Sequence, residues 1–173
     1  PALQFEMGWY NEYLWDADYA THWTKPDKSP ISARLWAIGQ VVSLDAAKRQ
    51  VEAWRAKGWD AASAEGLVSL YSKGASIAQK HFGAAAIEGL EKAAISGDAA
   101  SAAAADLAGE ATAATTQQER EIVLYGVASL ALACFDLRGE EPTDAFWNAF
   151  DGAIEAEGGA FATQVAALAA TAK

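Results

Sequence analysis

The chain has 173 residues, of which 52% are hydrophobic and 21% charged, and its formal net charge at pH 7 is −10. This composition argues against a disordered chain, and the length predicts one globular helical domain over residues 1–173. The negative charge argues against nucleic acid as a partner, because phosphate binding requires many Lys and Arg side chains. The charge is uneven: residues 96–173 hold twelve acidic and three basic side chains, whereas residues 31–60 hold three acidic and five basic ones.

No targeting or membrane signal is visible. The first residues, PALQFEMGWYNE, lack a basic region followed by an apolar core, so a cytoplasmic location is expected. Charges and glycines interrupt every apolar run well short of a membrane span, so no membrane contact is expected. The single cysteine, Cys134, cannot form an internal disulfide, and its apolar flanks predict a buried, unreactive thiol.

The segment YNEYLWDADYATHW, residues 10–23, carries five aromatic rings and three carboxylates. In a helix, Trp15, Tyr19 and Trp23 share one face, opposite a second face that contains Tyr10 and Tyr13. Two interpretations follow. The rings pack a terminal helix between layers of protein, or they form an exposed patch for a partner, since Trp and Tyr dominate interface energies.

Asp18 and His22 lie four residues apart in the same segment, a spacing that lets two side chains share an ion. Two local ligands fall short of the three or four that a zinc site uses, so a polar helical pair is the simpler interpretation. No metal and no other cofactor is therefore expected.

Helix-capping residues recur along the rest of the chain. Ser29 precedes Pro30 at a predicted first helical position, and a second predicted helix runs over residues 45–58 and a third over residues 60–74. Further helices are predicted at about 76–95, 97–114, 118–137 and 142–157, with a last one ending at residue 173. The fold class is all-α: a compact bundle of about seven to nine short helices around a buried central one, with a short α-solenoid as the alternative.

Two of these helices differ in their hydrophobic pattern. Residues 118–137 are apolar at every helical angle, which predicts a helix surrounded by protein and therefore the central helix of the bundle. Residues 76–95 are amphipathic, with Phe82 and Leu90 on one face. The opposite face carries charged residues, which predicts that His81 lies at the surface among charged neighbours.

The helix at 142–157 carries the most specific pattern. Phe146, Trp147, Phe150, Ala153 and Ile154 share one face, which predicts packing on the core. The opposite face forms an acidic stripe, and almost no Lys or Arg lies nearby to offset the repulsion between its charges. The predicted partner-binding residues are those of this stripe and the preceding turn, together with the N-terminal rings: Glu140, Glu141, Asp144, Asn148, Asp151, Glu155, Trp15, Tyr19 and Trp23.

No phosphate loop, zinc motif or calcium loop occurs, and neither His22 nor His81 lies in a recognisable catalytic motif, so the pattern favours a non-enzymatic function. The first hypothesis is a small acidic binding protein that recognises or neutralises a basic protein, as an immunity protein or an inhibitor does. The second is a metal- or small-ligand-binding helical domain of a stress-response type. An enzyme with a scattered site and a purely structural role are further alternatives.

Overall fold

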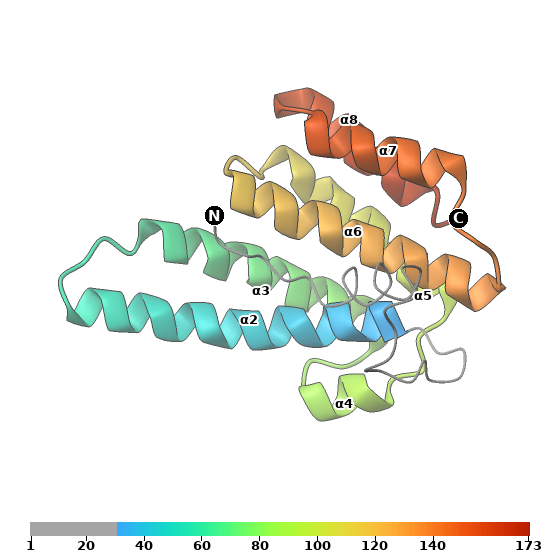
Figure 1. Cartoon of the computed structure of the whole chain (residues 1–173). Helices are drawn as coiled ribbons and strands as arrows, with labels where there is room; N and C mark the ends of the chain where they lie inside the picture. Colours follow the sequence, from blue (N-terminus) through green and yellow to red (C-terminus); the bar gives the residue numbers. More distant parts are fainter. Residues whose placement is uncertain (1–30) are drawn as a thin grey trace, which may run out of the picture.

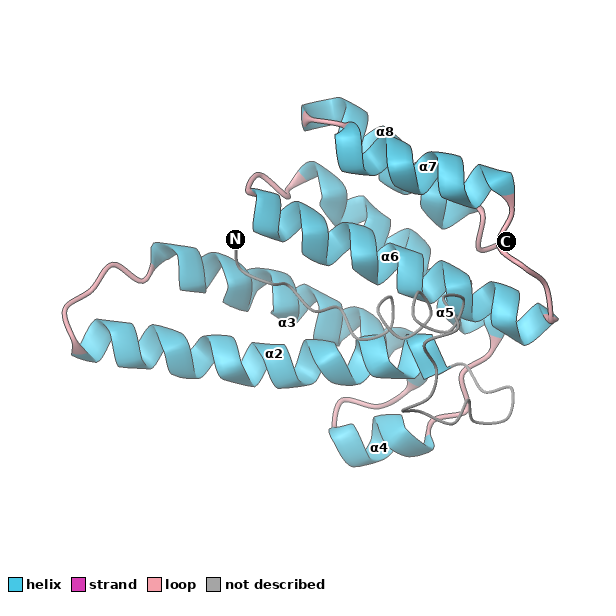
Figure 2. Ribbon diagram, viewed as in Figure 1, coloured by secondary structure: helices cyan, strands magenta, loops and turns pink. Residues whose placement is uncertain are grey.

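The computed structural model describes residues 31–173, with side chains from Ala33 onward (Figures 1 and 2). Every regular element in this part of the chain is helical, so the all-α prediction is confirmed. The elements are α2 (Ile31–Ala56), α3 (Ala62–Phe82), α4 (Ile87–Lys92), α5 (Gly97–Gly109), the 3-10 turn η1 (Glu110–Thr112), α6 (Gln117–Arg138), α7 (Asp144–Glu155) and α8 (Gly158–Ala170).

The long helices form three antiparallel pairs that are stacked in chain order (Figure 1). The α2–α3 pair and the α7–α8 pair lie on opposite sides of the α5–α6 pair, which is therefore the middle layer. The short helix α4 lies beside the start of α2, where the Arg34 guanidinium donates a hydrogen bond of 3.0 Å to the Ala93 carbonyl. The result is a compact bundle, as predicted.

Helix α6 is the centre of this bundle, as the apolar pattern of residues 118–137 predicts. Every residue from Gly126 to Phe135 is buried, and Leu130 is fully inaccessible to solvent. A capping box begins the helix: the Thr116 hydroxyl accepts a hydrogen bond from the Glu119 backbone N–H, and the Glu119 carboxylate accepts one from Thr116. The helix ends at Gly139, whose φ of 69° is a left-handed conformation that glycine adopts without strain.

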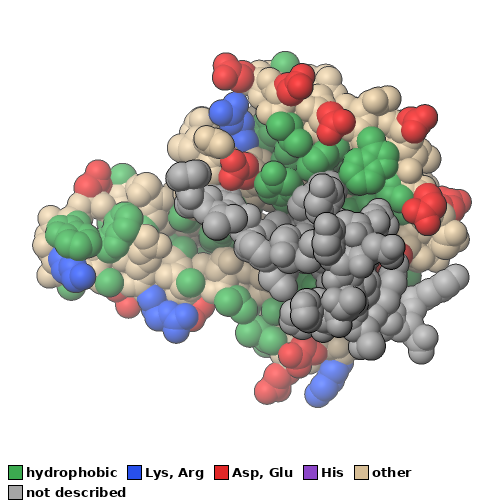
Figure 3. Space-filling model, in the orientation of Figure 1, with side chains coloured by type: hydrophobic (Ala, Val, Ile, Leu, Met, Phe, Trp, Pro, Cys, Tyr) green, Lys and Arg blue, Asp and Glu red, His purple; other side chains and the backbone are tan. Residues whose placement is uncertain are grey.

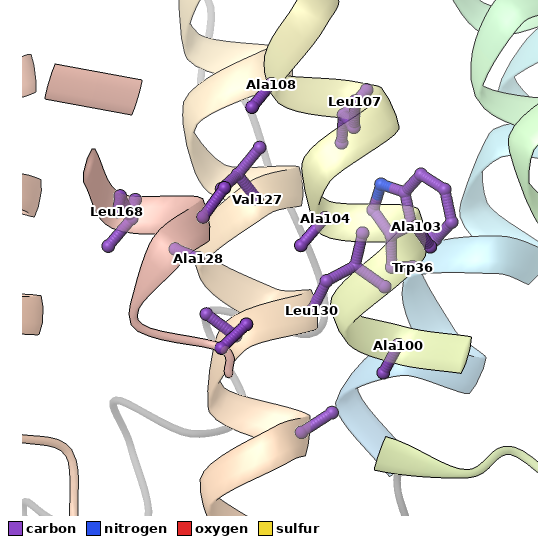
Figure 4. Close-up of a cluster of buried hydrophobic side chains, with 14 of the residues drawn as sticks. Trp36, Ala100, Ala103, Ala104, Leu107, Ala108, Val127, Ala128, Leu130 and Leu168 are labelled. Carbon is purple, nitrogen blue, oxygen red and sulfur yellow. The ribbon is translucent and has the colours of Figure 1, made fainter. Parts of the chain in front are cut away.

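Small side chains allow α5 and α6 to approach closely. The buried face of α5 is mostly alanine, and Trp36 from α2 fills the space beside it (Figure 4). A Cβ atom on Gly126 of α6 would lie 2.7 Å from Leu107 Cδ2 and 2.7 Å from Trp36 Nε1. Only glycine fits at this position without movement of a buried neighbour.

Three predicted helix boundaries are wrong. The helix predicted over residues 76–95 is interrupted, because α3 ends at Phe82, Gly83 adopts a left-handed φ of 71°, and α4 begins only at Ile87. The break expected at Asp45 does not occur, because α2 continues through it and Asp45 forms an ion pair of 2.8 Å with Arg49 one turn later. The end expected at Gly74 is also absent, because α3 continues to Phe82. Gly74 is buried against α2, where an added Cβ would lie 2.2 Å from Gln40 Oε1. This glycine marks a close helix contact, not a helix end.

The far end of the α2–α3 pair has a small hydrophobic cluster of its own, built on Val51, Ala61 and Ala64. It is separate from the main core, which contains buried residues of all three layers. Trp59 follows the turn there and is 58% exposed, with the Lys57 ammonium 4.6 Å from the centre of its ring.

Among residues 31–173, no helix combines the length and the hydrophobicity needed to cross a membrane.

Candidate partner-binding surface

Helix α7 is set in place by its cap and its apolar face. The Thr143 hydroxyl accepts a hydrogen bond of 3.4 Å from the Phe146 N–H, which satisfies a backbone donor of the first turn. Phe146 is fully buried and packs edge-on against Phe135 of α6 at a centroid distance of 5.9 Å. Burial of one such ring contributes about 1.5–3 kcal/mol, so this face anchors α7 on the core.

The predicted apolar face is confirmed for Phe146, Phe150 and Ala153, which are buried, whereas Trp147 is half-buried. The prediction is wrong for Ile154, which is 56% exposed. On a helical wheel Ile154 lies about 80° from Phe146, at the edge of the buried stripe, and in the last turn of α7 no described residue covers it.

The opposite face of α7 is the acidic stripe that the sequence predicts. Figure 3 shows acidic side chains in a row over this helix, at the edge of the molecule. We use the name acidic ridge for the exposed residues on this face and in the turn before it: Glu140, Glu141, Asp144, Asn148, Asp151 and Glu155.

Most of the ridge carboxylates have no ion pair among the residues that the structure describes. Glu140 is paired, since its carboxylate lies 2.6 Å from Arg138 Nε. Within residues 31–173, no Lys, Arg or His nitrogen lies within 4 Å of the other four ridge carboxylates, those of Glu141, Asp144, Asp151 and Glu155. Elsewhere in residues 31–173, four carboxylates form ion pairs with a basic side chain, and nine do not; the paired ones are Asp45, Glu65, Asp106 and Glu110. The ridge therefore differs in its arrangement, because its acids follow one another along a helix that contains no Lys or Arg.

A pocket of about 320 Å³ lies between the start of α6 and the end of α7, next to the ridge. We call it the α6–α7 pocket. Sequence reasoning missed it, except for Glu155. One signal was available: the α6 residues that line it follow helical spacing along one face, and they are Gln117, Arg120, Glu121, Leu124 and Tyr125.

His81 is less exposed than predicted. Its side chain is 14% exposed, and His81 Nε2 lies 2.7 Å from Asp106 Oδ2, which also accepts a hydrogen bond of 2.6 Å from Lys80 Nζ. The hydrogen bonds from Lys80 and then His81 hold the pKa of the Asp106 carboxyl below its usual range. This cluster links α3 to α5. It explains why His81, which lies on the charged face of its helix, is mostly covered.

The Cys134 thiol is buried, as predicted, and it donates a long hydrogen bond of 3.5 Å to the Gly97 carbonyl. Burial raises its pKa to about 11, so almost no thiolate is present at neutral pH.

Among the residues that the structure describes, no group of three or more His, Cys, Asp and Glu side chains is arranged to hold a metal ion. The predicted rings Trp15, Tyr19 and Trp23 and the pair Asp18 and His22 lie outside the described residues.

Residues 31–173 thus define an all-α protein whose most distinctive described surface is the acidic ridge on α7. Comparison of the chain with protein-family models, curated proteins and solved structures finds no match. A function is therefore inferred from the chemistry of the surface.

Proposed function

We propose that this protein is a small acidic helical binding protein that recognises or neutralises a basic protein partner through the acidic ridge. An immunity protein or another inhibitor of a basic protein is the kind of molecule that fits. The observation that carries the proposal is the arrangement of the ridge: exposed acids follow one another along one face of a helix that contains no Lys or Arg, and four of them have no ion pair within the described part of the chain.

Such a surface is costly for the free protein. Asp151 and Glu155 are four residues apart on one exposed face, and like charges at this spacing destabilise a helix by about 0.2–0.5 kcal/mol. A cationic partner surface removes that repulsion. Before contact, the negative field also raises the rate of encounter, since steered association can exceed the neutral rate by a factor of about 10–1,000 at low salt.

The test uses two double variants with equal net charge. In E141K/D151K two ridge acids are reversed, and in the control E52K/E91K two exposed acids of α2 and α4 are reversed. Each variant changes the formal charge from −10 to −6, because two acids become two bases. The wild-type protein is immobilised, exposed to an extract of the cells that encode it, and eluted with increasing salt, and the retained protein is then purified.

We expect a basic protein to bind wild type and the control with similar association rates. E141K/D151K should bind about tenfold more slowly, and its association rate should depend less on salt. Equal loss in both variants would show a response to net charge alone, and unchanged binding by E141K/D151K would refute the ridge as the contact. A gene for a basic toxin next to the gene for this protein would be independent support.

A further inference from the structure

The α6–α7 pocket combines an apolar floor with a charged rim. Leu124, Ala153 and Phe161 line it and are buried, whereas Ile154 lines it and is 56% exposed. Its volume of about 320 Å³ is at the lower end of the range of about 300–1,000 Å³ for ligand pockets, so it has room for one long side chain.

The rim is negative. Three carboxylates line the pocket, those of Glu121, Glu155 and Glu157, against one cation, Arg120. Within residues 31–173 none of the three forms an ion pair within 4 Å, although Glu121 Oε1 accepts a hydrogen bond of 2.8 Å from Gln117 Nε2. Three acids and one base leave a formal charge of −2 around the buried side chains of Leu124, Ala153 and Phe161.

The end of α7 makes the electrostatic potential of the pocket more negative. The last turn of α7 contains no basic residue, and the backbone leaves the helix at Ala156 in an extended conformation. The final carbonyl groups of a helix carry partial negative charge, and here the residues that follow them line the same pocket. Arg120 offsets only part of this field, because it is one cation against three carboxylates. Its guanidinium carbon lies 6.0 Å from the centre of the Phe161 ring.

We propose that the α6–α7 pocket receives an arginine side chain of the basic partner, an inference that rests on the proposed function and makes it more specific. The methylene stem would pack on Leu124 and Ile154, and the guanidinium would meet the rim carboxylates. Arginine fits better than lysine, because its planar group is less strongly hydrated, pairs with two carboxylate oxygens at once and stacks on aromatic rings.

The probe is the peptide N-acetyl-Gly-Arg-Gly-amide, titrated into the ¹⁵N-labelled full chain and followed by NMR. Binding should have a dissociation constant on the order of 1–10 mM and shift the amide signals of pocket residues in α6 and at the end of α7. The same peptide with neutral citrulline should not bind, and the lysine peptide should bind several-fold more weakly. Equal binding of citrulline or lysine, or shifts spread over all acidic surfaces, would overturn the assignment.

Variants separate the pocket from the effect of net charge. E121Q/E157Q removes two rim charges that are outside the ridge, and it should weaken arginine-peptide binding about tenfold. The matched control E52Q/E91Q removes two exposed charges outside both the pocket and the ridge and should leave peptide binding unchanged. R120Q makes the pocket more negative and should tighten binding about threefold, a direction that general damage to the pocket cannot produce.

This titration needs no protein partner, so its failure differs from failure of the proposed function. If the peptide does not bind but E141K/D151K still slows association of a basic protein, only the arginine pocket is refuted. If the peptide binds and no basic protein is retained, the ridge proposal and the protein source of the arginine are refuted together.

Discussion

Replacing Gly126 with alanine tests how tightly the middle layer is packed. The added methyl carbon would lie 2.7 Å from both Leu107 Cδ2 and Trp36 Nε1, whereas carbon atoms in contact lie about 3.5–4.0 Å apart. The Leu107 methyl can rotate, but the Trp36 ring cannot move freely. Trp36 is fully buried and packs edge-on against Phe82 at a centroid distance of 6.2 Å.

Two effects of opposite sign determine how much G126A changes the free energy of unfolding. Forcing an extra methyl group into a packed core costs about 1–3 kcal/mol. Alanine in a helix interior is favoured over glycine by about 1 kcal/mol, which offsets part of this cost. We therefore expect G126A to lower the free energy of unfolding by about 1–2 kcal/mol.

The matched control is G109A. Gly109 at the end of α5 is exposed, has a helical φ of −59°, and an added Cβ would meet no atom within 4 Å. Alanine there should raise stability by up to about 1 kcal/mol. Urea unfolding followed by tryptophan fluorescence and circular dichroism measures both variants. A G126A protein as stable as G109A would refute the close contact between α2, α5 and α6.

Three further outcomes follow from buried or capped residues. L130D should lower the free energy of unfolding by about 4 kcal/mol or more, since it buries an unpaired charge. L137D, at a 38%-exposed position of the same helix, should change the free energy of unfolding by less than about 1 kcal/mol. Similar melting temperatures for the two variants would refute the central place of α6. The native Cys134 thiol should react with Ellman's reagent only as fast as the protein unfolds, and rapid stoichiometric reaction of the native protein would contradict its burial and its pKa of about 11. Hydrogen bonds from the backbone N–H groups of Thr116 and Thr115 hold the pKa of Glu119 below its usual 4.5. This carboxylate therefore stabilises the fold above that pH, and its contribution is lost as the pH falls through the lowered pKa. The urea midpoint of wild type should fall more than that of E119Q between about pH 6 and pH 3.

The central helix could be predicted because its evidence is local. Residues 118–137 are apolar at all helical angles, and only a helix covered on every side accommodates that pattern. Thr116 and Gly139 then fix its ends at positions within two residues of the prediction. The acidic ridge is local in the same sense, because helical spacing alone puts Asp144, Asp151 and Glu155 on one face.

Several of the wrong predictions depend on contacts between helices. The sequence predicts a helix end at Gly74, but this glycine lies inside α3. The side chain of Gln40, 34 positions earlier, occupies the space that a Cβ atom at position 74 would need. His81 reads as exposed, but Asp106 from another helix covers it. The α6–α7 pocket requires the same kind of information, since Glu121 and Glu157 belong to one site only after α7 packs on α6.

The separate hydrophobic cluster at the tip of the α2–α3 pair has a practical consequence. Because the main core does not include Val51, Ala61 or Ala64, a change of chain connectivity at this tip need not disturb the other layers. Exposed loop tips are where inserted sequences are best tolerated, and Gly58 and Trp59 are both exposed. In Figure 1 this tip points away from α7. An affinity tag or fluorescent domain inserted between Gly58 and Trp59 would tether the protein to a surface with the acidic ridge facing the solution.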